Sequence, residues 1–212
     1  TRPRGSPTRP VAGPRTGPRM DLELPAGAAA WLLLSLAPLV AVCCTAFAKA
    51  SVVFSAVRVG LGAEALLPWS AVFALAVVVA AVVMGPVAQE IAAVSGGPVE
   101  ALAVFEPLAE FLRRHADPGE IAYFAGLGGV ADGHPLALVP AFLITELGEA
   151  LQMAAVILIP FVLVDLVLAQ IVALIGLSGQ VQPAVSLPIK LLLFLAAGGW
   201  DIVVRGLVEG YA

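Results

Sequence analysis

Four charged residues interrupt a strongly apolar run at positions 140–200: Glu146, Glu149, Asp165 and Lys190. A charged side chain at the centre of a bilayer is costly, so residues of this kind usually face protein or water. These four therefore mark either a site of function or a site of assembly.

Glu146 and Glu149 are three residues apart, so on a helix both carboxylates lie on one face, which Gln152 extends. Paired carboxylates in a helical bundle can bind two metal ions, but that site also needs Glu-x-x-His motifs, which the sequence lacks. Two interpretations remain open. The pair lies at a solvated helix end, with 136–145 outside the membrane, or it forms a polar face that meets neighbouring subunits or lines a water-filled path. We favour the polar face.

Asp165 is isolated in the sequence, because 150–164 and 166–189 contain no charged residue. A lone aspartate facing lipid would be costly or protonated. We therefore expect Asp165 to pair within an assembly, and Lys49 and Lys190 are the available cations.

The chain offers little material for an enzyme. The two histidines, His115 and His134, have no cysteine near them, so neither a zinc site nor a nucleophile triad can be assembled. The glycine-rich run 126–133 lacks the Lys-Ser/Thr of a phosphate-binding loop. Nucleic-acid binding needs clustered Lys or Arg, and the body of the chain is acidic. We predict no catalysis, no cofactor, no metal and no nucleic-acid partner.

The composition indicates a membrane protein. Hydrophobic residues make up 60% of the 212 residues, charged residues only 12%, and the mean hydropathy is +1.01. A soluble domain carries about 25% charged residues. There is too little polar surface here to cover a water-soluble globule of this size.

The N-terminal residues 1–19 differ from the rest. They hold five arginines, five prolines and no acid, and without them 6 basic residues face 15 acidic ones. A segment without apolar periodicity is expected to be disordered. We favour Met20 as the true start, with 1–19 an over-extended reading frame; the alternative is a basic tail that keeps the N-terminus in the cytoplasm. Residues 20–212 are then one membrane domain.

About four hydrophobic stretches are long enough to cross a bilayer as helices, which takes roughly 20 residues each. They are 26–57, 65–89, 136–177 and 184–204. The fold class is therefore an all-α membrane protein whose helical segments form kinked hairpins. We expect the second stretch to be the cleanest single span and Pro160 to kink or break the third.

Residues 90–135 form the polar module of the body, read as part helix and part loop. The apolar spacing over 98–114 is that of an amphipathic helix, which Pro107 could kink or split. Asp117-Pro118-Gly119 is a turn signal, and the glycines at 126–133 favour a loop.

Several pieces of the chain occur in an order and spacing that resemble the FliP/SctR (YscR/HrcR) family, the R-type export-apparatus subunit of type III secretion systems. The matching pieces are 47–58 (FAKASVVFSAVR), 84–87 (MGPV), 106–113 (EPLAEFLR), 140–150 (PAFLITELGEA), 160–167 (PFVLVDLV) and 186–194 (SLPIKLLLF). Together they cover about residues 40–205.

The resemblance implies a non-enzymatic role. Members form a homopentamer that joins smaller S-type and T-type subunits in an export gate within the basal body, at the bacterial inner membrane, and unfolded polypeptides pass through it. The charged residues would then be assembly or polar membrane contacts: Lys49, Arg58, Glu146, Glu149, Asp165 and Lys190.

One departure from the family concerns the loop after the third stretch, which is commonly methionine-rich and seals the closed pore. Here the corresponding residues contain no methionine: Leu177, Ser178, Gly179, Gln180, Val181 and Gln182. Flexible thioethers make an adaptable seal, which Ser, Gly and Gln do not reproduce. Sealing by this loop is therefore in doubt, or falls to Leu177 and Val181.

Flagellar members often carry a cleavable signal peptide ahead of the first match, and a start at Met20 leaves room only for the first span. The sequence therefore favours the injectisome type over the flagellar type. The alternative from another class is a multi-pass transporter or channel that works alone, with its embedded charges forming a substrate site.

Overall fold

The computed structural model describes residues 35, 38–94, 101–176 and 179–211. The chain divides into residues 1–36 and 37–212, and every contact described below lies within the second unit. All regular elements in the described ranges are helices: α2 (Phe47–Leu61), α3 (Trp69–Val83), α4 (Gly85–Val94), α5 (Ala101–His115), α6 (Pro118–Gly128), α7 (Pro135–Leu174), the 3₁₀ turn η1 (Gly179–Val181), α8 (Gln182–Ala196) and α9 (Gly199–Glu209). The expected N-terminal segment 1–19 and Met20 lie outside the described residues.

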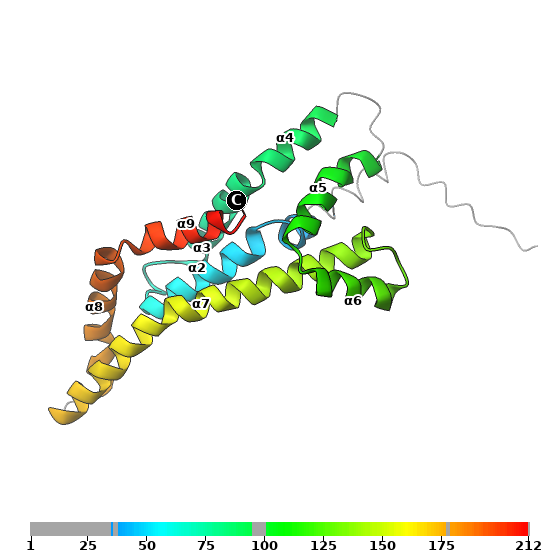
Figure 1. Cartoon of the computed structure of the whole chain (residues 1–212). Helices are drawn as coiled ribbons and strands as arrows, with labels where there is room; N and C mark the ends of the chain where they lie inside the picture. Colours follow the sequence, from blue (N-terminus) through cyan, green and yellow to red (C-terminus); the bar gives the residue numbers. More distant parts are fainter. Residues whose placement is uncertain (1–34, 36–37, 95–100, 177–178, 212) are drawn as a thin grey trace, which may run out of the picture. The chain divides into compact units, whose positions relative to one another are not determined.

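Helix α7 is the longest helix of the described residues, and α2, α5, α6 and α8 all pack against it. It starts where the His134 ring nitrogen accepts a hydrogen bond from the Leu136 N–H, with Pro135 in the first turn, and it continues for 40 residues. In Figure 1, α2 lies along its middle and α8 returns along its far end. The sequence predicted a kink or a break at Pro160. The break is wrong, because α7 runs through this residue, and the kink stays a prediction. A proline removes one backbone hydrogen bond, which does not end a helix held on both sides by packing.

Helices α2 and α7 approach each other closely at Gly60. An added Cβ there would lie 2.6 Å from the Phe161 ring and 2.9 Å from a Leu158 methyl group. Phe161 is buried in the core that α2 and α7 share with α3, α8 and α9. Helix α2 extends past the expected stretch 26–57: it continues to Leu61 and ends at Gly62, which has a left-handed φ of 67°.

Two of the expected hydrophobic stretches are bent pairs of helices. Helices α3 and α4 meet at Met84 with a bend of 55°, so the second stretch is not the clean single span that its composition suggested. Helices α8 and α9 meet at Gly198 with a bend of 59°. Gly198 has a φ of 65°, a conformation that favours glycine. In the first stretch, residues 38–43 are helical and the chain turns at 44–46 before α2.

The polar module folds onto the first turns of α7. Helix α5 forms as predicted and includes Pro107 without a break in its assigned span. The predicted turn at Asp117 is instead a helix start, since its carboxylate accepts hydrogen bonds from the backbone of Gly119 and Glu120 and caps α6. Helix α6 takes in the first glycines of the expected loop and ends at Gly129.

The second hydrophobic core lies between this module and α7. It combines Cys44 and Val87 with Leu138, Ala141 and Phe142 of α7. The remaining members come from α5, from α6 and from the connection between them: Ala109, Phe111, Leu112, Ala116 and Ile121. The start of α7 is therefore covered by protein, and the later part carries most of its exposed apolar side chains.

Among the described residues, only α7 is by itself long and apolar enough to cross a membrane. The pairs α3–α4 and α8–α9 would each qualify if a bent pair counts as one span. The described part of the chain thus holds one to three candidate spans, and the expected count of four long hydrophobic helices is not confirmed. Residues 26–34 of the first stretch lie outside it.

The crossing at Gly60 gives a prediction about stability. Gly60→Ala should lower the free energy of unfolding, because overpacking against Phe161 costs about 1–3 kcal/mol and exceeds the gain of up to about 1 kcal/mol in helix propensity. Gly148→Ala is the matched control: Gly148 lies in α7 and an added Cβ meets nothing within 4 Å. Thermal unfolding of the detergent-extracted protein measures both. Equal effects of the two substitutions would contradict the close approach.

Candidate functional site

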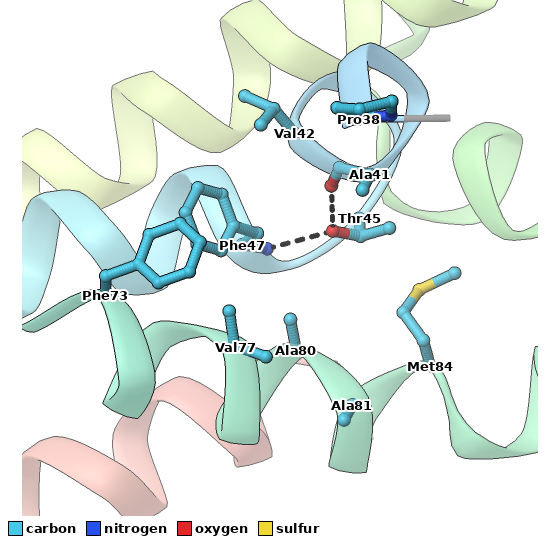
Figure 2. Close-up of a pocket in the computed structure, with 10 residues that line it drawn as sticks. All are labelled: Pro38, Ala41, Val42, Thr45, Phe47, Phe73, Val77, Ala80, Ala81 and Met84. Atoms are coloured by element: carbon cyan, nitrogen blue, oxygen red, sulfur yellow. Dashed lines mark hydrogen bonds between the residues drawn. The ribbon is translucent and has the colours of Figure 1, made fainter. Parts of the chain in front are cut away.

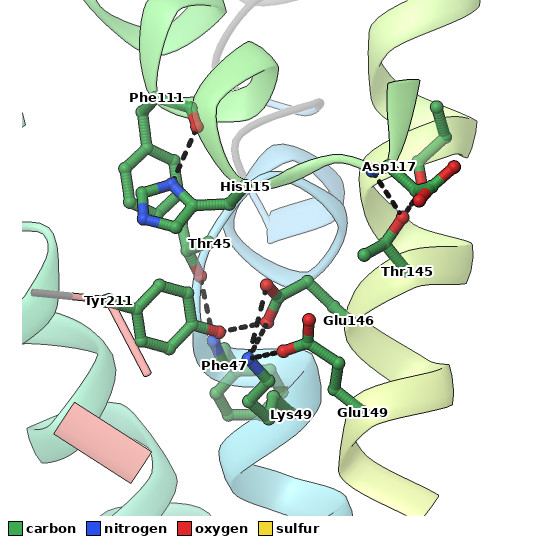
Figure 3. Close-up of polar contacts among 11 residues, drawn as sticks. Thr45, Phe47, Lys49, Phe111, His115, Asp117, Thr145, Glu146, Glu149 and Tyr211 are labelled. Carbon is green, nitrogen blue, oxygen red and sulfur yellow. Dashed lines mark hydrogen bonds and ion pairs between the residues drawn. The ribbon is translucent and has the colours of Figure 1, made fainter. Parts of the chain in front are cut away.

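Lys49 of α2 joins the acid pair of α7 in a buried cluster (Figure 3). Its Nζ lies 2.6 Å from Glu149 Oε2 and 3.3 Å from Glu146 Oε2. The Glu146 side chain also accepts a hydrogen bond from the hydroxyl of Tyr211, which follows α9. This cluster, which we call the Lys49 cluster, connects three segments that are far apart in the sequence.

Burial decides how each member of the Lys49 cluster behaves. The side chains of Lys49 and Glu146 are 2% and 1% exposed, whereas Glu149 is 51% exposed. A buried charge is tolerated only when it is paired and hydrogen-bonded. Lys49 and Glu146 therefore depend on each other, and Glu149 carries the acidic character of the cluster to the surface of α7.

Asp165 of α7 pairs with Lys190 of α8. The Lys190 Nζ donates to Asp165 Oδ2 at 2.5 Å, and the Ser186 hydroxyl donates to Oδ1 at 2.5 Å. Of the two cations that the sequence offers, Lys190 is thus the neighbour of Asp165, and Lys49 serves the glutamates. The Gln182 side chain donates to the Asp165 carbonyl at 3.1 Å. These contacts hold the hairpin of α7 and α8 together.

A hollow of about 410 Å³ opens beside this second ion pair. Asp165, Ser186 and Lys190 line its polar side, and Leu61 and Leu187 contribute to its apolar side. Lys190 is buried and the Asp165 side chain is 40% exposed. A polar group thus reaches the surface within a hydrophobic hairpin, next to the start of α8.

Arg58 has a different environment from the other predicted polar contacts. It is 9% exposed, its Nε donates to the Leu67 carbonyl at 2.6 Å, and its guanidinium lies 4.5 Å from the centre of the Trp69 ring. Such a stack on an aromatic ring is a favourable cation–π contact. Arg58 therefore fixes the connection between α2 and α3 rather than joining either carboxylate cluster.

The predicted pore-constriction loop is described only in part. Leu177 and Ser178 lie outside the described residues. Gly179, Gln180 and Val181 form the turn η1, and Gln182 begins α8. Gly179 and Val181 are exposed at the tip of the hairpin. Their sealing role stays a prediction.

Figure 2 shows a second hollow of about 410 Å³, between the segment that precedes α2 and one side of α3. Its walls are apolar except for Thr45, whose hydroxyl donates to the Ala41 carbonyl and accepts from the Phe47 N–H. This hydroxyl is already hydrogen-bonded within the chain. The hollow therefore suits apolar groups only.

The two histidines serve local structure. His115 contacts the Phe111 carbonyl through Nδ1 at 2.8 Å, and His134 caps α7. Among the described residues, no three His, Cys, Asp or Glu side chains lie together in a group that could hold a metal ion.

Sequence reasoning missed two members of the ion-pair clusters. Tyr211 has no unusual neighbours in the sequence, so nothing there signals its contact with Glu146. Ser186 precedes Lys190 by four residues and shares its helix face, a spacing that could have linked it to the same acid.

Comparison with known proteins identifies the family of the chain. The chain matches the FliP family over residues 31–207. It is 32% identical to the virulence protein YscR of Salmonella typhimurium, over 85% of this chain and 93% of that protein. It is also 32% identical to the Yop proteins translocation protein R of Yersinia pestis, over 84% of this chain and 92% of that protein. The flagellar biosynthetic protein FliP of Caulobacter vibrioides is 30% identical, over 84% of this chain and 73% of that protein.

By their names, these relatives act in virulence, in Yop protein translocation and in the biosynthesis of flagella. In the described residues the fold is all-helical, with one to three candidate membrane spans. The chain belongs to the FliP family.

The Lys49 cluster predicts a large effect of removing its cation. Lys49→Met should lower the free energy of unfolding by about 3–5 kcal/mol, because Glu146 is left buried without a counter-charge. Arg205→Met is the control, since Arg205 pairs with Asp201 on the surface and both side chains are more than half exposed. Thermal or denaturant unfolding in detergent compares the two variants. A loss no larger than that of Arg205→Met would show that the buried pair is not needed.

The Asp165 pair predicts a specific rescue. Asp165→Lys places two cations together and should reduce the yield of folded protein, and adding Lys190→Asp should restore much of that yield by reversing the pair. Adding Lys49→Asp instead should not restore it, because Lys49 lies in the other cluster. Yield is measured as the monodisperse fraction after mild extraction. Rescue by Lys49→Asp alone would mean that the pairing is wrong.

Proposed function

We propose that the chain is a core subunit of a type III secretion export gate. In this proposal it forms a homopentamer, joins smaller S-type and T-type subunits, and helps to build the conduit through which unfolded proteins cross the bacterial inner membrane. The FliP-family match over residues 31–207 is the observation that carries the proposal. The virulence protein of Salmonella typhimurium and the translocation protein of Yersinia pestis are similar to the chain along nearly their whole length.

The length of α7 supports a gate that extends beyond one bilayer. Its 40 residues span about 60 Å at 1.5 Å per residue, roughly twice the thickness of a hydrocarbon core. Its first turns are covered by the polar module, and its later turns expose apolar side chains such as Leu163, Val167 and Ile171. A helix of this kind suits an assembly in which neighbouring subunits cover part of the apolar surface.

The placement of the charges argues against a transporter that works alone. A stand-alone transporter needs embedded polar groups that face a substrate path. Here Lys49, Glu146 and Lys190 are buried and bound to partners within the chain. These charges connect α2 and α8 to α7, so we infer a structural role for them.

The injectisome form is the system we favour, and the flagellar form is the second candidate. Identity is 32% to the virulence-type relatives and 30% to the flagellar protein of Caulobacter vibrioides. The chain covers 93% of the Salmonella relative and 73% of the flagellar one. The match is therefore fuller to the virulence type.

Native mass determination after mild detergent extraction tests the proposal. We expect a pentameric mass for the chain, and a larger complex when the S-type and T-type subunits of the same system are co-expressed. Arg205→Met serves as a surface control that should assemble normally, since its ion pair with Asp201 is exposed. A solitary monomer that fails to bind either subunit would overturn the export-gate assignment.

A further inference from the structure

Tyr211 contacts side chains of three helices that are far apart in the sequence. Its hydroxyl donates to Glu146, and its ring centre lies 4.3 Å from the Lys49 Nζ. On its other side the ring stacks on Phe111 at 6.0 Å between centres and lies 5.2 Å from the His115 ring. Figure 3 shows Tyr211 between the Lys49 cluster and His115 of α5. One side chain after α9 thus contacts α2, α5 and α7.

The backbone next to Tyr211 also lies against Lys49. A Cβ at Gly210 would be 3.9 Å from the Lys49 Nζ, so the ammonium sits beside the last turn of α9. The C-terminal end of a helix carries partial negative charge, which favours a cation there. The end of α9 is therefore held at the Lys49 cluster by its backbone as well as by the tyrosine.

The Tyr211 hydroxyl keeps the proton that it donates to Glu146. Burial raises the pKa of its hydroxyl far above the ordinary value, and the nearby charge of Glu146 raises it further. The hydroxyl consequently stays protonated at any physiological pH. It supplies a hydrogen bond to a buried carboxylate, which is stronger than one between neutral groups.

We propose that Tyr211 is a latch that holds α5 against α7, and that its release opens the second core at Cys44. The ring binds α5 through Phe111 and His115, while the hydroxyl binds α7 through Glu146. Cys44 is 3% exposed and belongs to the same core cluster as Phe111. The latch concerns the movement of one helix within the chain, so it goes beyond the proposed export function and does not depend on it.

The native thiol Cys44 provides the readout. A buried cysteine reacts slowly, because reaction requires exposure of its thiolate, and local opening raises the rate in proportion to the open fraction. Cys43→Ser removes the second of the two cysteines, leaving Cys44 to be labelled with N-ethylmaleimide in native membranes. The labelling rate then reports how often α5 moves away from α7.

Two substitutions separate the parts of the latch. Tyr211→Phe keeps the ring and removes the hydrogen bond to Glu146, and it should raise the rate of Cys44 labelling about tenfold, as expected for a lost hydrogen bond to a charged group. Tyr211→Ala also removes the stacking on Phe111 and should raise the rate further. If the alanine variant fails to fold, the phenylalanine variant decides alone.

The other tyrosine of the chain is the matched control. Tyr123 is 63% exposed and contacts Phe124 within α6, so Tyr123→Ala should leave the rate unchanged. Wild-type labelling in Tyr211→Phe, or an equal rise in Tyr123→Ala, would overturn the latch. Labelling is measured on the chain itself, so failure of the latch is distinguishable from failure of pentamer assembly, which native mass reports.

Discussion

The buried pair of Lys49 and Glu146 is the interaction on which the arrangement of the helices depends. These residues are 97 positions apart in the sequence, and each is almost fully inaccessible. Because neither charge is tolerated without the other, α2 must pack on α7 in one register. The same register places Gly60 against Phe161 further along both helices. The end of α9 then completes the cluster through Tyr211.

The sequence identifies the charged residues but not their partners. Asp165 and the two lysines stand out because charges are rare in apolar segments. Which lysine serves which acid depends on the helix faces that meet, and this is tertiary information. Lys190 reaches Asp165 because α8 folds back along α7. Tyr211 gives no signal in the sequence, since a tyrosine near a chain end is unremarkable until the fold brings Glu146 to it.

The helix breaks illustrate a similar limit. Proline was expected to mark them, yet Pro107 and Pro160 lie inside helices. One break lies at Met84, which has a helical φ of −82° and is followed by Gly85 and Pro86. The other lies at Gly198, which has a positive φ. A proline costs one hydrogen bond, which packing can offset, whereas a left-handed residue changes the direction of the chain itself. The hydrophobic pattern accordingly predicted where apolar segments lie better than where they bend.

Pairing charges within one chain has a consequence for helices that lie in a membrane. A chain with unpaired charges would be unfavourable in lipid until its neighbours arrived. Here Lys49 and Lys190 are paired with acids of the same chain, so neither cation would lie in a bilayer without its counter-charge. The exposed members of the two clusters are acids: the side chain of Glu149 is 51% exposed and that of Asp165 is 40% exposed. The lysines therefore connect the helices, and Glu149 and Asp165 are the members of the two clusters that reach the surface.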